Sequence, residues 1–334
     1  MSFSLPIGMN IHRWGTPFFA YDKSHLSDNL DACRELGIKL IRYNNSFRSE
    51  NAARDISTVV GEVKKRDMQM MLVIDDQGWR DKEVTGEIDS LEEYYENYMY
   101  CIADSLKGKI EIYQLFNEMD IAGMRGDIAN IILPGKDGRE KGEYDSILWE
   151  RAVASVKGAI KGIKKGDPDA KTCVNFAWWH TALIYEMYRR GCDFDIIGID
   201  WYSDCEEVSS IDKLIDDVKK NIPGKDFIIC ETNFWMHPMG RDPVEKQNAL
   251  KVKELRDENQ KKWVPEFIEK IVGLKDPSIL GIVFYELLDE PYYEKEDYCG
   301  EAHFGFIECD ANGGNKLKKP AYESLKNCIK NLNL

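Results

Sequence analysis

The chain has 334 residues, 43% of them hydrophobic and 31% charged, which is the composition of a globular protein with a sizeable core. Its formal net charge of −14 argues against a nucleic-acid partner, because phosphate backbones would be repelled. The length allows one large domain or two ordinary ones. No linker, low-complexity tract or composition shift divides the sequence, so we expect a single domain over residues 1–334.

The N-terminal segment and the cysteines bear on the location of the protein. The segment MSFSLPIGMNIHRWG has no basic region followed by an apolar stretch, and no apolar run approaches the length of a bilayer span. The nine cysteines are scattered and lie mostly in apolar stretches, which is typical of reduced thiols. We therefore expect a cytoplasmic protein without a membrane partner. The residues do not indicate an oligomeric state.

The spacing of histidines and cysteines gives no indication of a metal site. Only five histidines are present, and no CxxC, HxH or HExxH pattern occurs. We therefore expect neither a metal nor an organic cofactor.

Short apolar runs recur along the whole chain and predict strands. Most are continuous in apolarity, as expected for parallel strands that are covered on both faces. There are eight such runs, at residues 6–12, 39–44, 69–75, 110–116, 171–177, 194–201, 226–231 and 279–285.

Segments of helical periodicity lie between these runs. The clearest cover residues 26–37, 90–108, 147–166, 209–222 and 320–332, and a long one begins at 242. Gly37 is placed to end the first helix, and Ser90 with Glu93 fits a capping box at the start of the second. Asp242 can cap the long helix, with Pro243 in its first position.

Eight strands alternating with about as many helices predict a (β/α)8 barrel. An open doubly wound sheet is the alternative, but such sheets usually have fewer strands and a glycine-rich phosphate turn after the first strand. The segment after the first run, NIHRWGTPFFAYD, contains no such turn. In a barrel, catalytic groups lie at the C-terminal ends of the strands, so the candidate site residues are sought there.

The predicted strand ends are rich in tryptophan. Six of the eight tryptophans in the chain follow strands: Trp14, Trp79, Trp178, Trp179, Trp201 and Trp235. For any single one, packing under a loop is an adequate explanation. As a group they favour a carbohydrate site, because flat and weakly polar rings suit the faces of sugars. We take Trp178, Trp179, Trp201 and Trp235 as candidate sugar contacts.

Two glutamates at strand ends carry the main functional prediction. Glu118 follows the fourth run in IEIYQLFNEMD, and Glu231 closes the seventh in DFIICETNFW. The fourth and seventh strands are three steps apart in an eight-membered ring, so the two side chains can approach each other across the barrel mouth. Two carboxyl groups about 5–5.5 Å apart are the catalytic pair of a retaining glycoside hydrolase, in which one protonates the leaving oxygen and the other attacks the anomeric carbon.

The sequence resembles the clan A glycoside hydrolases, barrel enzymes with an Asn-Glu acid/base pair on the fourth strand and a nucleophile on the seventh. The matching motifs are LFNEMD, IICETNF, IRYN, IGIDWY and the closing segment EAHFGFIECDANGGNKLKKPAYESL. The resemblance spans the whole predicted barrel. Families 5, 39 and 53 of the clan are the most similar in general appearance.

This resemblance implies roles for five residues. Glu118 would be the acid/base and Glu231 the nucleophile of a retaining β-glycosidase. Asn117 would form a hydrogen bond with the sugar 2-hydroxyl. Arg42 would keep the nucleophile ionised, and Tyr202 would donate a hydrogen bond to the same carboxylate.

The sequence departs from the clan at the eighth strand and at two histidines. Many clan members end this strand with a tryptophan beneath the cleaved sugar, whereas here the run is GIVFYELLDEP, so Tyr285 or Glu286 would serve. His180 matches no family position, and both a sugar-hydroxyl contact and a solvated rim residue are compatible with it. His12, together with Arg13, is expected to line the pocket.

Three functional hypotheses remain after these observations. The first is a retaining β-glycosidase acting on an oligosaccharide or polysaccharide. The second is a catalytically weak carbohydrate-binding barrel, against which the intact glutamate pair argues, because binding alone needs no second carboxylate there. The third is an aldolase or isomerase barrel, which would need a strand-end Schiff-base lysine or a phosphate-binding glycine turn near the last strands. The sequence contains neither.

Overall fold

Eight parallel strands close into a barrel in chain order, each bonded to its sequence neighbours and β8 to β1. The computed structural model describes residues 5–15, 17–45, 52–122, 130–203, 206–235, 249–295 and 301–332. The strands are β1 (Ile7–Ile11), β2 (Leu40–Asn45), β3 (Gln69–Ile74), β4 (Ile112–Leu115), β5 (Lys171–Ala177), β6 (Ile196–Asp200), β7 (Asp226–Thr232) and β8 (Ile279–Phe284). The prediction of eight strands in a (β/α)8 barrel is confirmed.

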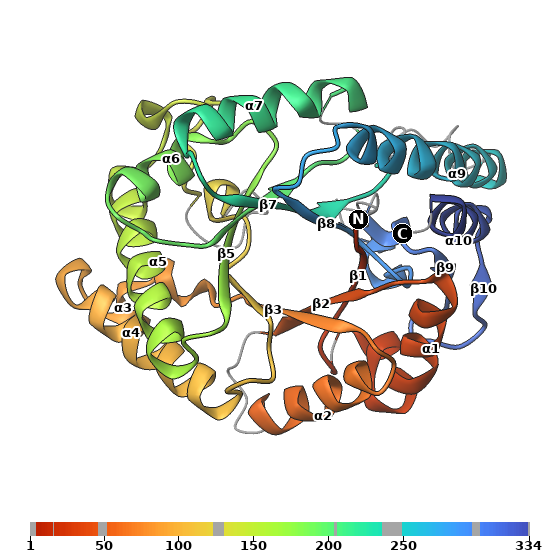
Figure 1. Cartoon of the computed structure of the whole chain (residues 1–334), viewed down its shortest axis with the longest axis horizontal. Helices are drawn as coiled ribbons and strands as arrows, with labels where there is room; N and C mark the ends of the chain where they lie inside the picture. Colours follow the sequence, from red (N-terminus) through yellow and green to blue (C-terminus); the bar gives the residue numbers. More distant parts are fainter. Residues whose placement is uncertain are drawn as a thin grey trace.

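Helices surround the strands (Figure 1). They are α1 (Leu26–Leu36), α2 (Ala52–Lys64), α3 (Lys82–Thr85), α4 (Ile88–Ser105), α5 (Ser146–Gly166), α6 (Ala182–Arg189), α7 (Ile211–Asn221), α9 (Ala249–Gly273) and α10 (Pro320–Leu332). A two-stranded antiparallel sheet, β9 (Ile307–Glu308) with β10 (Leu317–Lys318), lies between β8 and α10. The helices expected from periodicity therefore occur at or close to the predicted positions.

The predicted helix ends are correct in one case and wrong in another. Gly37 ends α1 with a φ of 90°, a left-handed conformation that glycine adopts without steric cost. The capping box at Ser90 is wrong, because α4 begins two residues earlier, after Glu87, and the Ser90 hydroxyl donates to the Glu87 carbonyl at 3.0 Å. Asp242 and Pro243 lie outside the described residues.

Alternate residues of each strand face the interior of the barrel. An apolar cluster fills part of this interior, made of Leu40, Met71, Cys173, Ile196, Ile228, Cys230 and Val283. Two residues further along β2 and β5, the corresponding positions hold Arg42 and Asn175, which are also buried. The interior therefore becomes polar toward the C-terminal ends of the strands, where the candidate site lies.

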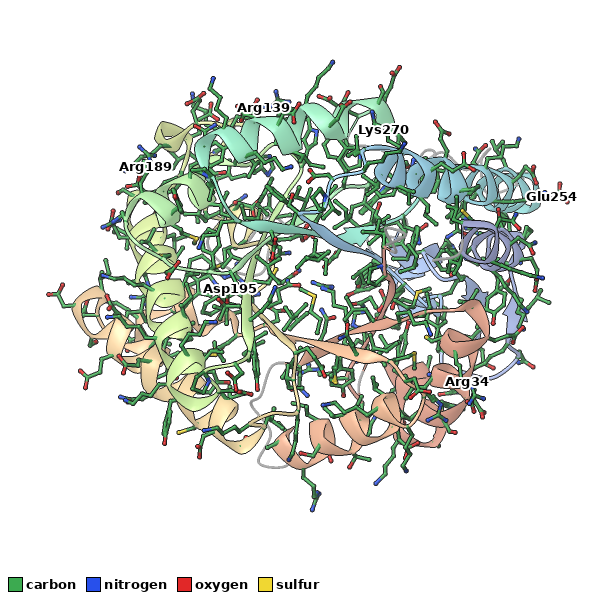
Figure 2. The ribbon with its side chains drawn as sticks, viewed as in Figure 1. Arg34, Arg139, Arg189, Asp195, Glu254 and Lys270 are labelled. Carbon is green, nitrogen blue, oxygen red and sulfur yellow. The ribbon has the colours of Figure 1, made fainter. Side chains whose placement is uncertain are left out.

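The outer surface of the helix ring carries much of the charge. Figure 2 shows Arg34 on α1, Arg189 on α6 and Glu254 on α9 at the periphery, and all three are exposed. None of the helices in the described ranges is both long and apolar enough to span a membrane. Each of the seven cysteines in those ranges is a free thiol.

Helices α4 and α5 pack closely because α5 presents a glycine at every fourth position. Gly158, Gly162 and Gly166 all face the backbone of α4. A Cβ at Gly162 would lie 2.9 Å from Met99 Cβ and 2.9 Å from the Tyr100 nitrogen, and it would also overlap a carbonyl oxygen. Substitution there must push the helices apart.

We expect Gly162→Ala to lower the free energy of unfolding by about 1–3 kcal/mol, because an added methyl group overpacks the contact. Gly61→Ala is the matched control, since Gly61 is an exposed glycine within α2 and an added Cβ meets no atom within 4 Å. That change should raise stability by up to about 1 kcal/mol. Urea unfolding of both variants measures the difference, and equal effects of the two substitutions would contradict the close packing.

Candidate active site

The structure brings the two predicted catalytic glutamates together. Glu118 follows β4 and Glu231 lies in β7, and one carboxyl oxygen of each falls within 4.8 Å of the other and of an oxygen of a third carboxyl group, that of Asp200. Glu231 is 5% exposed, whereas Glu118 is half-buried. The pairing across the barrel that the sequence predicted is therefore present.

Arg42 lies inside the barrel and contacts Glu231 directly. Its Nη2 is 2.8 Å from Glu231 Oε1, and the other donors bind Gln114 Oε1 at 2.8 Å and Asn10 Oδ1 at 2.9 Å. Burial disfavours the guanidinium charge, but the neighbouring Glu231 carboxylate outweighs this and raises the pKa of Arg42. Arg42 is thus a permanent cation in direct contact with the Glu231 carboxyl group.

Tyr202 binds the other oxygen of the Glu231 carboxylate. Its hydroxyl donates to Glu231 Oε2 at 2.8 Å. Burial and the neighbouring charges of Glu231 and Glu118 raise the pKa of Tyr202 well above its usual value, so the hydroxyl stays a donor. Trp235 and Phe304 surround the tyrosine ring, with centroids 5.9 and 5.1 Å away.

Asn117 has a fixed amide orientation. Its Oδ1 accepts from Arg42 Nη2 at 2.8 Å, from Gln114 Nε2 at 2.9 Å and from Asn175 Nδ2 at 3.0 Å. Because three donors converge on this position, the oxygen and not the nitrogen must occupy it. The Asn117 amide nitrogen is left as a donor on the opposite side.

The backbone at the end of β4 turns sharply to present Glu118. Phe116 and Glu118 have φ values of 63° and 42°, in the left-handed region that costs a residue with a side chain about 1–3 kcal/mol. The Glu118 N–H donates to Asn175 Oδ1 at 3.1 Å. Asp120, in the next turn, accepts from the Ala177 N–H at 2.9 Å. Side chains and backbone of β5 therefore hold the turn that carries Glu118.

The structure divides the strand-end tryptophans into two groups. Trp14, Trp178, Trp179 and Trp235 are partly exposed, whereas Trp79 and Trp201 are 0% exposed. The prediction that Trp201 contacts sugar is therefore wrong. Strand alternation explains this, because Asp200 faces the barrel interior and the next side chain, Trp201, packs in the core between strands and helices.

Trp178 and His180 form a second aromatic group after β5. The Arg139 guanidinium lies 4.3 Å from the centre of the Trp178 ring and covers one of its faces. His180 is 7% exposed, with Nδ1 3.4 Å from Asp120 Oδ2, so the interpretation as a solvated rim residue is wrong. The two rings meet edge to face at 5.7 Å.

His12 and Glu286 lie in a buried cluster between β1 and the segment after β8. His12 Nε2 is 3.0 Å from Glu286 Oε2 and 3.3 Å from Glu290 Oε1, and the Tyr21 hydroxyl donates to Glu286 at 2.6 Å. Burial and the charge of Glu286 raise the pKa of Glu290 well above its usual value. Glu286 is 0% exposed, so the prediction that it contacts a sugar is wrong, whereas Tyr285 is partly exposed.

Two groups of described residues have the composition of a metal site. Each places three potential ligand atoms within 4.8 Å, one with His12, Glu286 and Glu290 and the other with Glu118, Asp200 and Glu231. The first is already linked by hydrogen bonds to two tyrosines, Tyr21 and Tyr292. The second contains the predicted catalytic pair.

Sequence reasoning missed four polar residues of the site. Asn10, Gln114, Asn175 and Asp200 each interrupt an apolar strand, and each has a side chain that binds Arg42 or the Asn117–Glu118 turn directly or through a neighbour. The signal was present in the sequence, since a polar residue inside a buried strand needs a partner.

A (β/α)8 barrel with a carboxylate pair after its fourth strand and in its seventh is the architecture of a clan A glycoside hydrolase. The match to glycosyl hydrolase family 53 covers residues 77–303, which include Glu118 and Glu231. The chain belongs to glycosyl hydrolase family 53 and is a glycosidase.

Solved structures of similar fold include β-glucosidases and the AHE enzyme. The family 1 β-glucosidase of Thermotoga maritima has a TM-score of 0.71 at 11% identity, covering 99% of this chain and 98% of that one. Its complex with deoxynojirimycin has a TM-score of 0.72 at 12% identity, covering 100% and 99%. The AHE enzyme of Alicyclobacillus herbarius has a TM-score of 0.67 at 12% identity, covering 100% and 98%. No curated protein sequence matches the chain.

A buried ion pair anchors the segment that follows β8 at the site. Lys319 Nζ lies 2.6 Å from Asp289 Oδ1 and donates to the His303 carbonyl at 2.9 Å, and both charged side chains are buried. Burial disfavours the Asp289 carboxylate, but Lys319 and His303 outweigh this and lower its pKa. The pair therefore stabilises the fold above the pKa of an unfolded aspartate, and this stabilisation is lost as the pH falls through the lower folded value.

We expect Lys319→Met to lower the free energy of unfolding by about 3–5 kcal/mol at neutral pH, because Asp289 is left buried without its cation. The loss should shrink near about pH 4, where the unpaired carboxylate takes up a proton. Urea unfolding at the two pH values measures both effects. The double variant Lys319→Met with Asp289→Asn is the control and should recover part of the loss. A penalty that does not depend on pH would contradict this explanation.

Proposed function

We propose that this glycosidase is a retaining β-glycosidase acting on an oligosaccharide or polysaccharide, with the whole chain as one catalytic domain. The observation that carries the proposal is the approach of the Glu118 and Glu231 carboxylate oxygens to within 4.8 Å. An inverting enzyme needs carboxyl groups about 6.5–9.5 Å apart, to leave room for a water molecule beside the sugar. The observed approach favours direct attack by one carboxylate.

The surroundings of the two glutamates support different roles. Arg42 forms an ion pair with one oxygen of Glu231, and Tyr202 donates a hydrogen bond to the other. Both interactions stabilise a carboxylate. Glu118 is more exposed and lies beside Glu231, whose negative charge favours a proton on it. We therefore assign Glu231 as the nucleophile and Glu118 as the acid/base.

The reaction proceeds in two displacements. Glu231 attacks the anomeric carbon and forms a glycosyl ester, while Glu118 gives its proton to the departing glycosidic oxygen. Glu118, now ionised, takes a proton from a water molecule, whose oxygen attacks the same carbon and breaks the ester bond. Two inversions restore the original anomeric configuration.

Neighbouring groups supply sugar contacts in this proposal. The free donor side of Asn117 suits the sugar 2-hydroxyl, a hydrogen bond that strengthens in the transition state. Trp235 packs against Tyr202 and Tyr285 packs against Phe304, and both are partly exposed aromatic rings that suit the face of a sugar ring. The Thermotoga maritima β-glucosidase has been solved in complex with glucoimidazole. A carbohydrate ligand at the same end of this barrel is in keeping with these contacts.

We expect Glu231→Ala to lower kcat by at least about a thousandfold on whichever aryl β-glycoside the native enzyme cleaves, because the covalent step is lost. Asp226→Asn is the matched control, since Asp226 begins the same strand at the opposite end of the barrel. A nitrophenol-release panel measures the rates, and NMR of the first-formed sugar should show the β-anomer. An α-anomer as first product, or full activity of the alanine variant, would overturn the assignment. Sugar binding without turnover by the native protein would favour the catalytically weak barrel.

We expect Glu118→Ala to lower the rate of hydrolysis of glycosides with poor leaving groups by about 10²–10⁴-fold. Activated aryl glycosides should be less affected in their first step, because nitrophenolate departs without a proton. Added azide should then restore turnover and yield a β-glycosyl azide, since the anion needs no general base. Equal losses for good and poor leaving groups, with no azide rescue, would remove Glu118 from the acid/base role.

A further inference from the structure

A third carboxyl group lies beside the proposed catalytic pair. Asp200 ends β6, is 1% exposed, and has one carboxyl oxygen within 4.8 Å of an oxygen of Glu118 and of an oxygen of Glu231. The proposed mechanism assigns no role to Asp200. Its position beside two other carboxyl groups makes its protonation state, ionised or neutral, the point to settle.

The ionisable groups that face Asp200 come from three other strands and from its own. They are Glu231 and Cys230 of β7, Glu118 after β4, Arg42 of β2, and Tyr202 just beyond β6. Among the described groups around Asp200, Arg42 is the cation, and it is engaged 2.8 Å from Glu231. One guanidinium offsets one carboxylate, so further negative charge in this buried space is unfavourable.

The hydrogen bonds of Asp200 lead to the proposed acid/base through one asparagine. Asp200 Oδ2 accepts from Asn175 Nδ2 at 2.6 Å. The same amide donates to Asn117 Oδ1 at 3.0 Å, and its oxygen accepts from the Glu118 N–H at 3.1 Å. Asp200 thereby fixes the orientation of an amide that contacts both residues of the Asn-Glu pair.

The second oxygen of Asp200 distinguishes the two protonation states. Oδ1 is buried and has no hydrogen-bond partner among the described residues. A buried carboxylate oxygen without a partner is costly, whereas a neutral carboxyl group without one loses much less. The environment therefore suits the acid form.

We propose that Asp200 is a neutral positioning residue, which keeps its own proton and, through Asn175, holds the Asn117–Glu118 turn in place for acid/base catalysis. The inference rests on the proposed function of Glu118. Burial, together with the charges of Glu231 and Glu118, raises the pKa of Asp200 well above its usual value. Neutrality also serves the second displacement, because a charged neighbour would oppose the ionisation of Glu118 that water activation requires.

The first test is the pH dependence of kcat/KM for Asp200→Asn. The asparagine reproduces a neutral group that can accept from Asn175, so we expect kcat/KM within roughly threefold of native. The alkaline limb of the profile should stay in place, because no charge has been removed. If Asp200 is ionised in the native enzyme, the same substitution would move that limb to lower pH by about one unit or more, and the inference fails.

The second test separates positioning from packing. We expect Asp200→Ala to lower kcat by about 10–100-fold with a small change in KM, because Asn175 loses its anchor and the Glu118 turn shifts. Asp200→Asn should restore most of this loss. Equal activity of the alanine and asparagine variants would exclude a positioning role. Thermal unfolding of each variant checks that the fold is retained.

A third measurement needs no substrate. Infrared spectra of native protein and Asp200→Asn near neutral pH should differ by the carbonyl band of a protonated carboxyl group, and absence of that band overturns the inference. Asp167→Asn is the control, because Asp167 is a buried aspartate before β5, where it accepts from the Gly108 N–H at 2.8 Å.

If Glu231→Ala remains active, the proposed function fails. If that variant is inactive while Asp200→Asn moves the alkaline limb, only the role of Asp200 fails.

Discussion

The buried guanidinium of Arg42 is the interaction on which the polar end of the barrel depends. A full charge inside a protein requires a counter-charge and partners for every donor. Glu231 supplies the charge, and Asn10, Gln114 and Asn117 accept the remaining hydrogen bonds. Each partner comes from or follows a different strand from that of Arg42, so the cation fixes the relative positions of β1, β2, β4 and β7. Removal of any one partner would leave part of a charged group unsatisfied.

This constraint links the chemistry to the architecture. The apolar part of the interior, with Leu40, Met71 and Cys173, supplies packing energy, and the polar part places the carboxyl groups. Asn117 illustrates the connection, because its oxygen is held by three donors and its nitrogen is thereby aimed away from the network. The amide is oriented before any ligand arrives, which lowers the cost of ordering the site when a sugar binds.

Sequence reasoning found the strands and the glutamate pair because both have strong local signals. Continuous apolar runs mark buried parallel strands, and an Asn-Glu step at the end of one is conspicuous.

The exposure of side chains at strand ends was less predictable. Trp201 and Glu286 follow their strands as the candidate residues should, yet both are buried. Whether a strand-end side chain faces the barrel or the helices depends on register, and loops can cover it in either case. The start of α4 was misjudged because the chain after Gly86 turns into the helix earlier than the Ser90 pattern suggested.

A local irregularity in β7 shows how register controls the chemistry. Ile199 pairs with Ile229 and Asp200 with Glu231, so β7 holds one extra residue, Cys230, between these pairs. In a regular strand, the residue after an inward one faces the helices. Cys230 belongs to the interior cluster, yet Glu231 also reaches Arg42 inside the barrel. The bulge allows two consecutive side chains to face inward, a known use of bulges beside functional sites. Without it, the carboxylate of Glu231 would point toward the helix layer, and neither Arg42 nor Asp200 would have its present neighbour.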